Sequence, residues 1–252
     1  MSGKFTVMAG WDDVPHLSPA QKAEESARIP PYQIDARSKG IPQLGAGAIY
    51  PVPESEVLCD PFVIPDHMPQ GYALDVGWKR TAVVWGAHDQ DSDIVYLYSE
   101  HYVGQEKPPV HAAAIRARGD WIPGVFDPAA RGRQQRDGEK LLDDYNNLGL
   151  TLSPAQNAVE AGLYDVWVRL ATGRLKVFRT MQNWLKEFRL YRRDEKGHIV
   201  KENDHLMDCT RYLVVSGISL MTVRPASMWK MQGAAPQHQS DYDPFAQSWN
   251  RK

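Results

Sequence analysis

The chain has 252 residues, of which 42% are hydrophobic and 24% charged, with 19 Gly, 18 Pro and 2 Cys. This is the composition of an ordinary globular protein, and it excludes a disordered polymer, collagen and a disulfide scaffold. The net charge of −2 hides a basic stretch, because residues 169–201 carry ten Lys and Arg against three Asp and Glu. Such a stretch either faces an anionic polymer or is a solvated surface, so charge alone assigns no function.

Targeting and cysteine signals are weak. No stretch approaches the ~18 apolar residues of a membrane span, and the N-terminus lacks the basic and apolar segments of a signal peptide. We therefore expect a soluble protein without a membrane partner. Cys59 and Cys209 form neither a zinc cluster nor a CxxC pair, as expected in a reducing compartment.

The first 65 residues are interrupted by proline and show no sustained apolar period, which predicts a connecting arm. One short helix is expected within it. Ser18 is placed to cap this helix, Pro19 suits its first position, Gln21 completes a capping box, and Pro30 ends it.

Three β-rich runs follow, over 71–76, 81–85 and 94–98. The turns between these runs are short and polar, so the strands must pair antiparallel as two successive hairpins.

Helices and strands then alternate. The pattern predicts a helix over 108–118, a strand over 124–127, a helix over 138–148, a strand over 150–152 and a helix over 159–171. Crossover helices between short strands imply parallel pairing. Three antiparallel strands followed by this alternation is the element order of the α/β ribonuclease H-like fold, a mixed sheet flanked by helices. Element order alone is weak evidence of function.

The C-terminal part is predicted to hold a helix over 181–188, a basic hairpin over 190–200 and a helix from 204 to about 220. The remaining residues are polar. The expected organisation is therefore an arm over 1–65, one domain over 66–225 and a polar tail over 226–252.

Two aspartates end apolar strands. Asp75 follows Leu74, and Asp127 follows Phe126. A carboxylate in such a place needs a cation, several hydrogen-bond donors or an exposed strand end. A structural salt bridge explains one such residue, but two strands that each end in Asp can lie side by side in one sheet.

A third acidic position opens the last helix. Asp204 and Asp208 are four residues apart, hence on one face, near the helix N-terminus that favours negative charge by about 0.3–1 kcal/mol. Capping explains Asp204, whereas Asp208 lies deeper and must point at something polar. Aspartates without a cysteine cluster suit hard cations such as Mg²⁺ or Mn²⁺, and two such ions about 3.5–4 Å apart can cleave a phosphodiester. That Asp75, Asp127 and Asp208 converge is inferred from the element order.

Three segments resemble the nuclease half of a tailed-phage terminase large subunit, namely 71–82, 126–129 and, most specifically, 203–212. Segments 10–17 and 29–33 resemble the part that follows the ATPase domain in that family. The resemblance covers most of residues 6–225. It implies a nuclease that cuts concatemeric viral DNA during packaging in the host cytoplasm, with double-stranded DNA, an ATPase domain, a small terminase subunit and a portal as partners. The chain has no GxxxxGK[ST] loop, so we expect the nuclease portion without the motor.

By motif position, the metal-binding acids of the family carry over to Asp75, Asp127 and Asp208, which would bind two Mg²⁺ or Mn²⁺ ions. Asp204 and His205 belong to the same motif and either cap the helix or hold a neighbouring ligand in place. The cations expected to contact DNA phosphates follow two of these acids or lie near the late hairpin. They are Lys79, Arg80, Arg131, Arg133, Arg136, Arg189, Arg192 and Arg193.

Two alternatives stay open at this point. One is a resolvase or transposase-like nuclease with the same fold, which would act as an independent dimer. The other is a packaging component that grips DNA without cutting it, against which the three aspartates argue. Trp78, directly after the Asp75 turn, is a candidate to line a DNA groove, although most tryptophans are core residues.

Overall fold

The computed structural model describes residues 10–14, 16–28, 38, 47–126, 135–156 and 158–231, without the side chains of residues 28, 135–140 and 229–231. The chain divides into two compact units. The first is Met1–Pro51 with Tyr191–Val200, and the second is Val52–Leu190 with Lys201–Lys252.

The first unit contains the short 3-10 helix η1 (Trp11–Asp13) and the helix α1 (Pro19–Arg28). The predicted capping box of α1 is confirmed. The Gln21 N–H donates to Ser18 Oγ at 3.3 Å, and the Ser18 N–H donates to Gln21 Oε1 at 3.0 Å. These bonds satisfy two backbone donors at the helix start.

The basic hairpin also belongs to the first unit. A β-bridge pairs Arg193 with Ile199. Asp194 Oδ1 accepts the backbone N–H groups of Lys196 and His198, each at 2.9 Å, and Gly197 takes the left-handed conformation with φ of 84°. The predicted turn is therefore confirmed, although the preceding Leu190 ends a helix instead of opening the hairpin.

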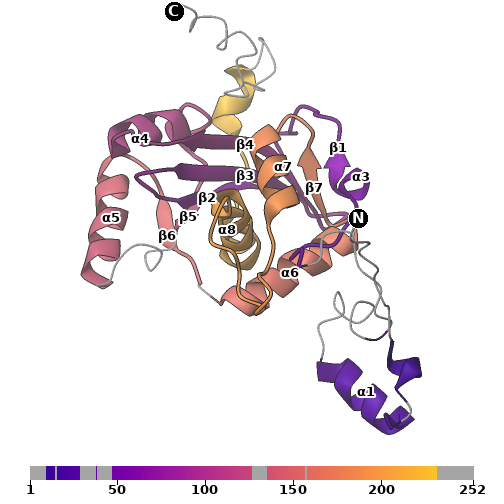
Figure 1. Cartoon of the computed structure of the whole chain (residues 1–252). Coiled ribbons are helices and arrows are strands. Elements are labelled where there is room, and N and C mark those ends of the chain that lie inside the picture. The colour runs from indigo at the N-terminus through magenta and orange to yellow at the C-terminus, as the bar shows by residue number, and fades with distance from the viewer. Residues whose placement is uncertain are drawn as a thin grey trace, which may run out of the picture. The chain divides into compact units, whose positions relative to one another are not determined.

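The second unit is built on a seven-stranded mixed sheet with the order β1-β7-β4-β3-β2-β5-β6 (Figure 1). The strands β2 (Gln70–Asp75), β3 (Thr81–Asp89) and β4 (Ile94–Val103) pair antiparallel, as their short turns predict. The strands β5 (Gly124–Phe126) and β6 (Leu152–Pro154) add in parallel beside β2. The predicted mixed sheet is confirmed.

The other edge of the sheet holds two strands that the sequence pattern does not predict. The strand β7 (Leu175–Phe178) lies parallel to β4, and β1 (Leu58–Cys59) lies parallel to β7. Both are too short to show an alternating pattern. With the short helix α3 (Glu54–Val57), β1 brings part of the proline-rich segment into the second unit.

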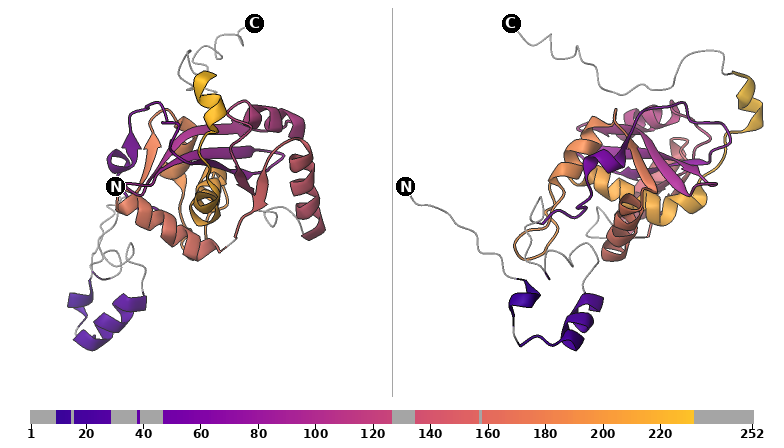
Figure 2. Two further views of the ribbon diagram at one scale, coloured as in Figure 1. Left: turned by 180° about the vertical axis from the view of Figure 1, so that it is seen from behind. Right: turned by 90° about the vertical axis from the view of Figure 1, so that its right-hand side faces the viewer.

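Helices cover both faces of the sheet. One face packs on α4 (Pro108–Arg116) and α5 (Gln135–Asn147). The other packs on α8 (His205–Tyr212), flanked by α6 (Val159–Ala171) and α7 (Gln182–Leu190) (Figures 1 and 2). Each of these helices was expected from the sequence pattern, and α6 has the predicted bounds.

Strand alternation decides which side chains meet α8. Tyr72 and Leu74 of β2 belong to the core cluster beneath α4 and α5. Successive side chains point to opposite faces, so Asp75 points to the α8 face.

The last helix departs from the expected continuous run to about residue 220. After Tyr212 the chain continues as the π-helical turn η3 (Leu213–Gly217), the 3-10 turn η4 (Ile218–Leu220) and, further on, η5 (Ala226–Met231). Within the described ranges, no helix has the length and apolar content needed to cross a membrane.

Candidate active site

Asp75 is the last residue of β2, and its side chain is 11% exposed. Its Oδ2 lies 2.8 Å from Nδ1 of His205, the first residue of α8. This hydrogen bond raises the pKa of His205, against the opposing effect of burial. The end of the strand and the start of the helix are therefore joined by a bond that a positive imidazole strengthens.

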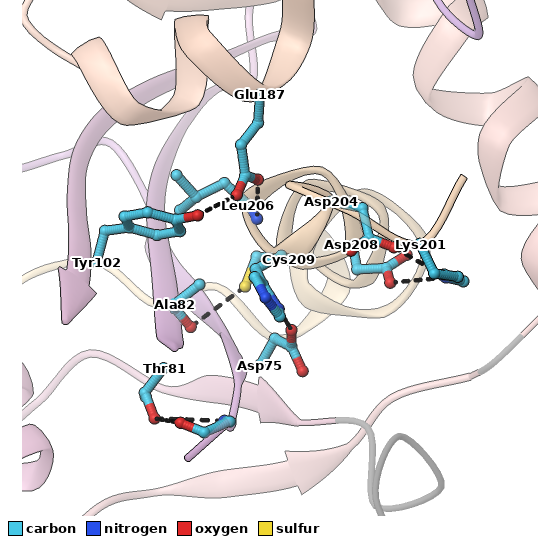
Figure 3. A network of polar contacts seen from close by, with 12 residues as sticks. Asp75, Thr81, Ala82, Tyr102, Glu187, Lys201, Asp204, Leu206, Asp208 and Cys209 are labelled. Carbon is cyan, nitrogen blue, oxygen red and sulfur yellow. Dashed lines mark hydrogen bonds and ion pairs between the residues drawn. The ribbon is translucent and has the colours of Figure 1, made fainter. Parts of the chain in front are cut away.

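Asp204 and Asp208 share one cation at the start of α8. The Lys201 Nζ lies 3.2 Å from Asp204 Oδ2 and 3.3 Å from Asp208 Oδ2 (Figure 3). Burial raises the pKa of the Asp204 carboxyl, and the charge of Lys201 opposes this rise. Two neighbouring carboxylates repel each other, so a cation within reach of both reduces the cost of placing them together.

A second cation reaches Asp208 from its own helix. Arg211 Nη2 and Nε lie 2.9 Å and 3.3 Å from Asp208 Oδ1. Arg211 is buried, and Gly162 of α6 makes room for it, since a Cβ at that glycine would lie 2.8 Å from Arg211 Cγ. Both oxygens of Asp208 therefore accept from cations.

The N-terminus of α8 is capped by Glu187 of α7. Asp204 occupies the N-cap position, but its side chain makes no capping bond, so the capping role considered for it is not observed. Glu187 Oε2 instead accepts the Leu206 N–H at 2.6 Å, and Oε1 accepts the Tyr102 hydroxyl at 2.6 Å. Burial raises the pKa of Glu187, although both donors oppose the rise. The Asp204 carboxylate thus points to Lys201 instead of to the helix end.

The helix α7 is held in the same way. Glu100 of β4 accepts the Asn183 N–H on Oε1 at 2.9 Å and the Trp184 N–H on Oε2 at 2.8 Å. Carboxylates at helix N-termini satisfy N–H groups that have no partner within the helix and interact favourably with the helix dipole. β4 therefore positions α7, and α7 positions α8. The sequence did not predict the capping roles of Glu187 and Glu100, because in the sequence each resembles an ordinary surface glutamate.

Asp127 lies outside the described residues. The strand before it ends at Phe126, which pairs with Leu74, the residue before Asp75. The strand that ends in Asp75 and the strand that precedes Asp127 in the sequence are therefore parallel neighbours, as predicted. In the part of the chain that the structure describes, no three His, Cys, Asp or Glu side chains form a group that could hold a metal ion, so the convergence of all three acids stays a prediction.

The donor chemistry fits a hard divalent cation. Asp75 and Asp208 offer carboxylate oxygens, which are the ligands that Mg²⁺ and Mn²⁺ prefer, and the ion pairs of Lys201 with Asp204 and Asp208 place a positive charge at the start of α8. Cys209 is no thiolate ligand, because burial raises its pKa well above the usual value and its thiol donates to the Ala82 carbonyl at 3.3 Å.

The cations expected to bind DNA have different environments. Lys79 is exposed, and the Arg80 guanidinium lies 4.5 Å from the centre of the Tyr102 ring. Arg189 makes two hydrogen bonds to Glu54, at 2.7 Å and 2.6 Å, so its charge is already partnered.

The hairpin arginines belong to the first unit. Arg192 is exposed, and Arg193 Nη1 donates to the Gly197 carbonyl at 2.9 Å. Arg131 and Arg133 lie outside the described residues, and Arg136 lies on α5 with its side chain undescribed.

Two curated proteins are similar in sequence. The terminase large subunits of Enterobacteria phage LP7 and Salmonella phage P22 are each 34% identical to this chain over 211 residues, which is 79% of it. The matches cover 44% and 42% of those proteins, so the chain spans less than half of their length. No family model matches.

Solved structures agree with these relatives. The nuclease domain of the P22 large terminase has a TM-score of 0.67 and 31% identity, covering 71% of this chain and 96% of that domain. The large terminase of a thermophilic bacteriophage, solved in complex with ADP, has a TM-score of 0.59 and 20% identity, covering 82% of this chain and 54% of that one. The large terminase nuclease of the thermophilic phage G20c, solved with bound magnesium, shares the fold with a TM-score of 0.50 at 15% identity, over 68% of this chain and 98% of that one. The fold class predicted from the element order is confirmed.

Proposed function

The chain belongs to the family of phage terminase large subunits, and we propose that it is a metal-dependent endonuclease that cuts viral DNA during genome packaging. The observation that carries the proposal is the placement of Asp75 at the end of β2, bonded to the first residue of the helix that bears Asp208. Carboxylate side chains that lie close to one another are the ligands that the divalent ions of phosphodiester cleavage require.

We assign Asp75, Asp127 and Asp208 as the ligands of two Mg²⁺ or Mn²⁺ ions. The parallel pairing of β2 and β5 supports this assignment, because it ends both strands at one edge. The magnesium in the G20c nuclease, which has the same fold, supports the choice of metal. When bound, such ions activate a water molecule and stabilise the departing oxygen of the phosphodiester.

The surrounding residues hold these ligands in position. His205 fixes the orientation of the Asp75 carboxylate through its 2.8 Å hydrogen bond. Arg211 fixes Asp208 on one side, while the more exposed Lys201 balances its charge on the other. Lys79 and Arg80 directly follow the β2 turn and are placed to contact DNA phosphates.

We further propose that the chain works in the host cytoplasm with an ATPase part, a small terminase subunit and a portal. The match to the LP7 subunit covers 44% of that protein, which leaves room there for the ATPase part. Double-stranded DNA is the proposed substrate, gripped through phosphate contacts that depend strongly on salt.

Nicking of supercoiled plasmid tests the function. We expect the wild-type chain to nick and linearise plasmid in Mg²⁺ or Mn²⁺ and to be inactive in EDTA. Asp75→Asn and Asp208→Asn should each lose at least about 100-fold in rate, since each substitution removes a ligand charge at nearly constant volume. Asp91→Asn, at an exposed position in the β3–β4 turn, is the matched control and should cut normally.

The plasmid assay tests one alternative, because a component that only grips DNA would bind plasmid and leave it intact in every metal. Cleavage of branched and linear duplexes in the same buffers tests the other, because a resolvase would prefer branched junctions. Normal cutting by Asp75→Asn would contradict the metal-site assignment.

A further inference from the structure

Trp78 differs from the core tryptophans of the second unit. Its side chain is 66% exposed, whereas Trp85 and Trp184 are fully buried. It lies in the loop between β2 and β3, three residues after Asp75. A single exposed apolar residue needs no explanation by itself, so the surroundings of Trp78 decide its significance.

The loop around Trp78 is held from two sides. Thr81 Oγ1 donates to the Gly77 carbonyl at 3.1 Å and accepts the Gly77 N–H at 3.4 Å. On the other side, the Gln105 N–H donates to the Trp78 carbonyl at 2.8 Å. Gly104 is required for this approach, because a Cβ there would overlap the Lys79 carbonyl oxygen. The backbone that carries the indole is therefore ordered before any ligand binds.

The neighbours of Trp78 are cationic. Lys79 is exposed, and Arg80 is fixed over the ring of Tyr102, whose hydroxyl is bonded to Glu187. Along the loop, Gly77 precedes Trp78 and the cations Lys79 and Arg80 follow it, so the exposed indole has a glycine and two cations as its immediate neighbours in the sequence. Aromatic rings beside positive charges are what nucleic-acid surfaces use, the ring for a base and the cations for the phosphates.

We propose that Trp78 is a stacking platform for an unpaired base of the DNA at or beside the point of cleavage. The inference rests on the proposed function, because the platform begins three residues after a metal-ligand candidate. Stacking on an indole is insensitive to sequence, since every base has a π face. A platform that is ordered in advance loses little conformational entropy on binding.

The experiment uses the full chain in EDTA, where the DNA stays uncut, and a duplex with a short single-stranded end that carries 2-aminopurine. The wild-type chain should bind it and quench its fluorescence. Trp78→Ala should lose about tenfold in affinity together with the quenching, while Trp78→Phe should keep most of both. Tyr164→Ala, which removes a 42% exposed aromatic side chain from α6, is the matched control and should behave as wild type.

Thermal unfolding of Trp78→Ala and Trp78→Phe should match wild type, because the Trp78 side chain is exposed. Wild-type affinity and quenching in Trp78→Ala would overturn the platform. A loss in Trp78→Phe as large as in Trp78→Ala would also overturn it, since phenylalanine keeps an aromatic face. A plasmid assay run in parallel separates the two proposals. If the wild-type chain cuts plasmid but Trp78→Ala binds DNA as tightly as wild type, only the platform is overturned. If the wild-type chain neither binds nor cuts DNA, the proposed function is overturned as well.

Discussion

Buried carboxylates in the second unit take their donors from other elements of the fold. Asp75 of β2 is bonded to His205 of α8, and Glu187 of α7 receives donors from both β4 and α8. A buried charge without such partners is costly. Each carboxylate therefore links two or three elements, and its removal is felt beyond its own position.

Glu187→Ala should lower the free energy of unfolding by about 2–4 kcal/mol, because the Leu206 N–H and the Tyr102 hydroxyl lose their acceptor and a cavity forms. Glu187→Gln keeps a carbonyl oxygen as an acceptor, so its free energy of unfolding should fall clearly less than that of Glu187→Ala. Urea unfolding measures both variants. Lys186→Ala, at an exposed position of the same helix, is the control and should change stability by less than ~0.5 kcal/mol. A Glu187→Ala variant as stable as wild type would contradict the capping role.

Asp93 provides a pH prediction. Although partial burial opposes ionisation, hydrogen bonds from His88, Arg174 and Arg169 outweigh it and lower the pKa of Asp93 to about 2. A carboxyl whose pKa is lower in the folded than in the unfolded protein stabilises the fold at any pH above its unfolded pKa of 3.8. This contribution disappears as the pH falls through the folded pKa of about 2. The side chain is 43% exposed, so solvent screening limits the contribution at pH 7 to about 1 kcal/mol or less.

Asp93→Asn should therefore be less stable than wild type at pH 7, and the difference should shrink between pH 4 and pH 2. Asparagine tolerates the left-handed backbone of this position, where φ is 52°, so the change isolates the charge. Denaturant unfolding across this pH range measures the difference. Asp91→Asn in the same turn is the control, and an equal loss of stability in that variant would attribute the effect to the turn and not to the three side chains that bond to Asp93.

At the scale of elements, the start of α8 is positioned by a succession of contacts. Glu100 of β4 caps α7, Glu187 of α7 caps α8, and Gly162 of α6 lets Arg211 reach Asp208. The first contact holds α7 on the sheet, and the other two join α7 and α6 to the helix that bears Asp208. We expect the geometry of the acidic site to be sensitive to how closely these helices pack.

Gly162→Ala tests this close packing. At an exposed position inside a helix, replacing glycine by alanine raises the free energy of unfolding by about 1 kcal/mol. Here the new Cβ would lie 2.8 Å from Arg211 Cγ and 3.0 Å from Val215 Cγ2, so α6 must shift or Arg211 must leave Asp208. We expect a net loss of about 1–2 kcal/mol and slower plasmid cleavage.

Ala161→Gly, the exposed neighbour on α6, serves as the comparison. It should lose about 1 kcal/mol through helix propensity alone and cut plasmid normally. A Gly162→Ala variant that is more stable than wild type and equally active would refute the packing of α6 against Arg211.

At the scale of the whole molecule, metal binding should be coupled to folding. A ligand that binds only the native chain stabilises it by about 2.7 kcal/mol at 100 times its dissociation constant. Thermal unfolding in Mn²⁺ should therefore occur at a higher temperature than in EDTA. Asp75→Asn and Asp208→Asn should lose most of this shift, while Asp91→Asn should keep it. An equal shift in all four proteins would place the bound metal elsewhere.

The sequence by itself determined the local features of this protein. The capping box at Ser18, the strand that ends in Asp75 and the bounds of α6 follow from side-chain periodicity and turn chemistry, which act over a few residues. The motif at 203–212 likewise indicated the family before any contact was known. These features need no knowledge of which elements meet.

Only the tertiary structure decided which residues become partners. His205 and Asp75 are 130 residues apart, and Arg189, predicted to contact DNA, pairs with Glu54 at a separation of 135 residues. The strands β1 and β7 and the cap supplied by Glu187 depend in the same way on distant elements. A hydrogen bond or a strand pair forms when packing brings two segments within about 3–5 Å, and a local pattern carries no information about its distant partner.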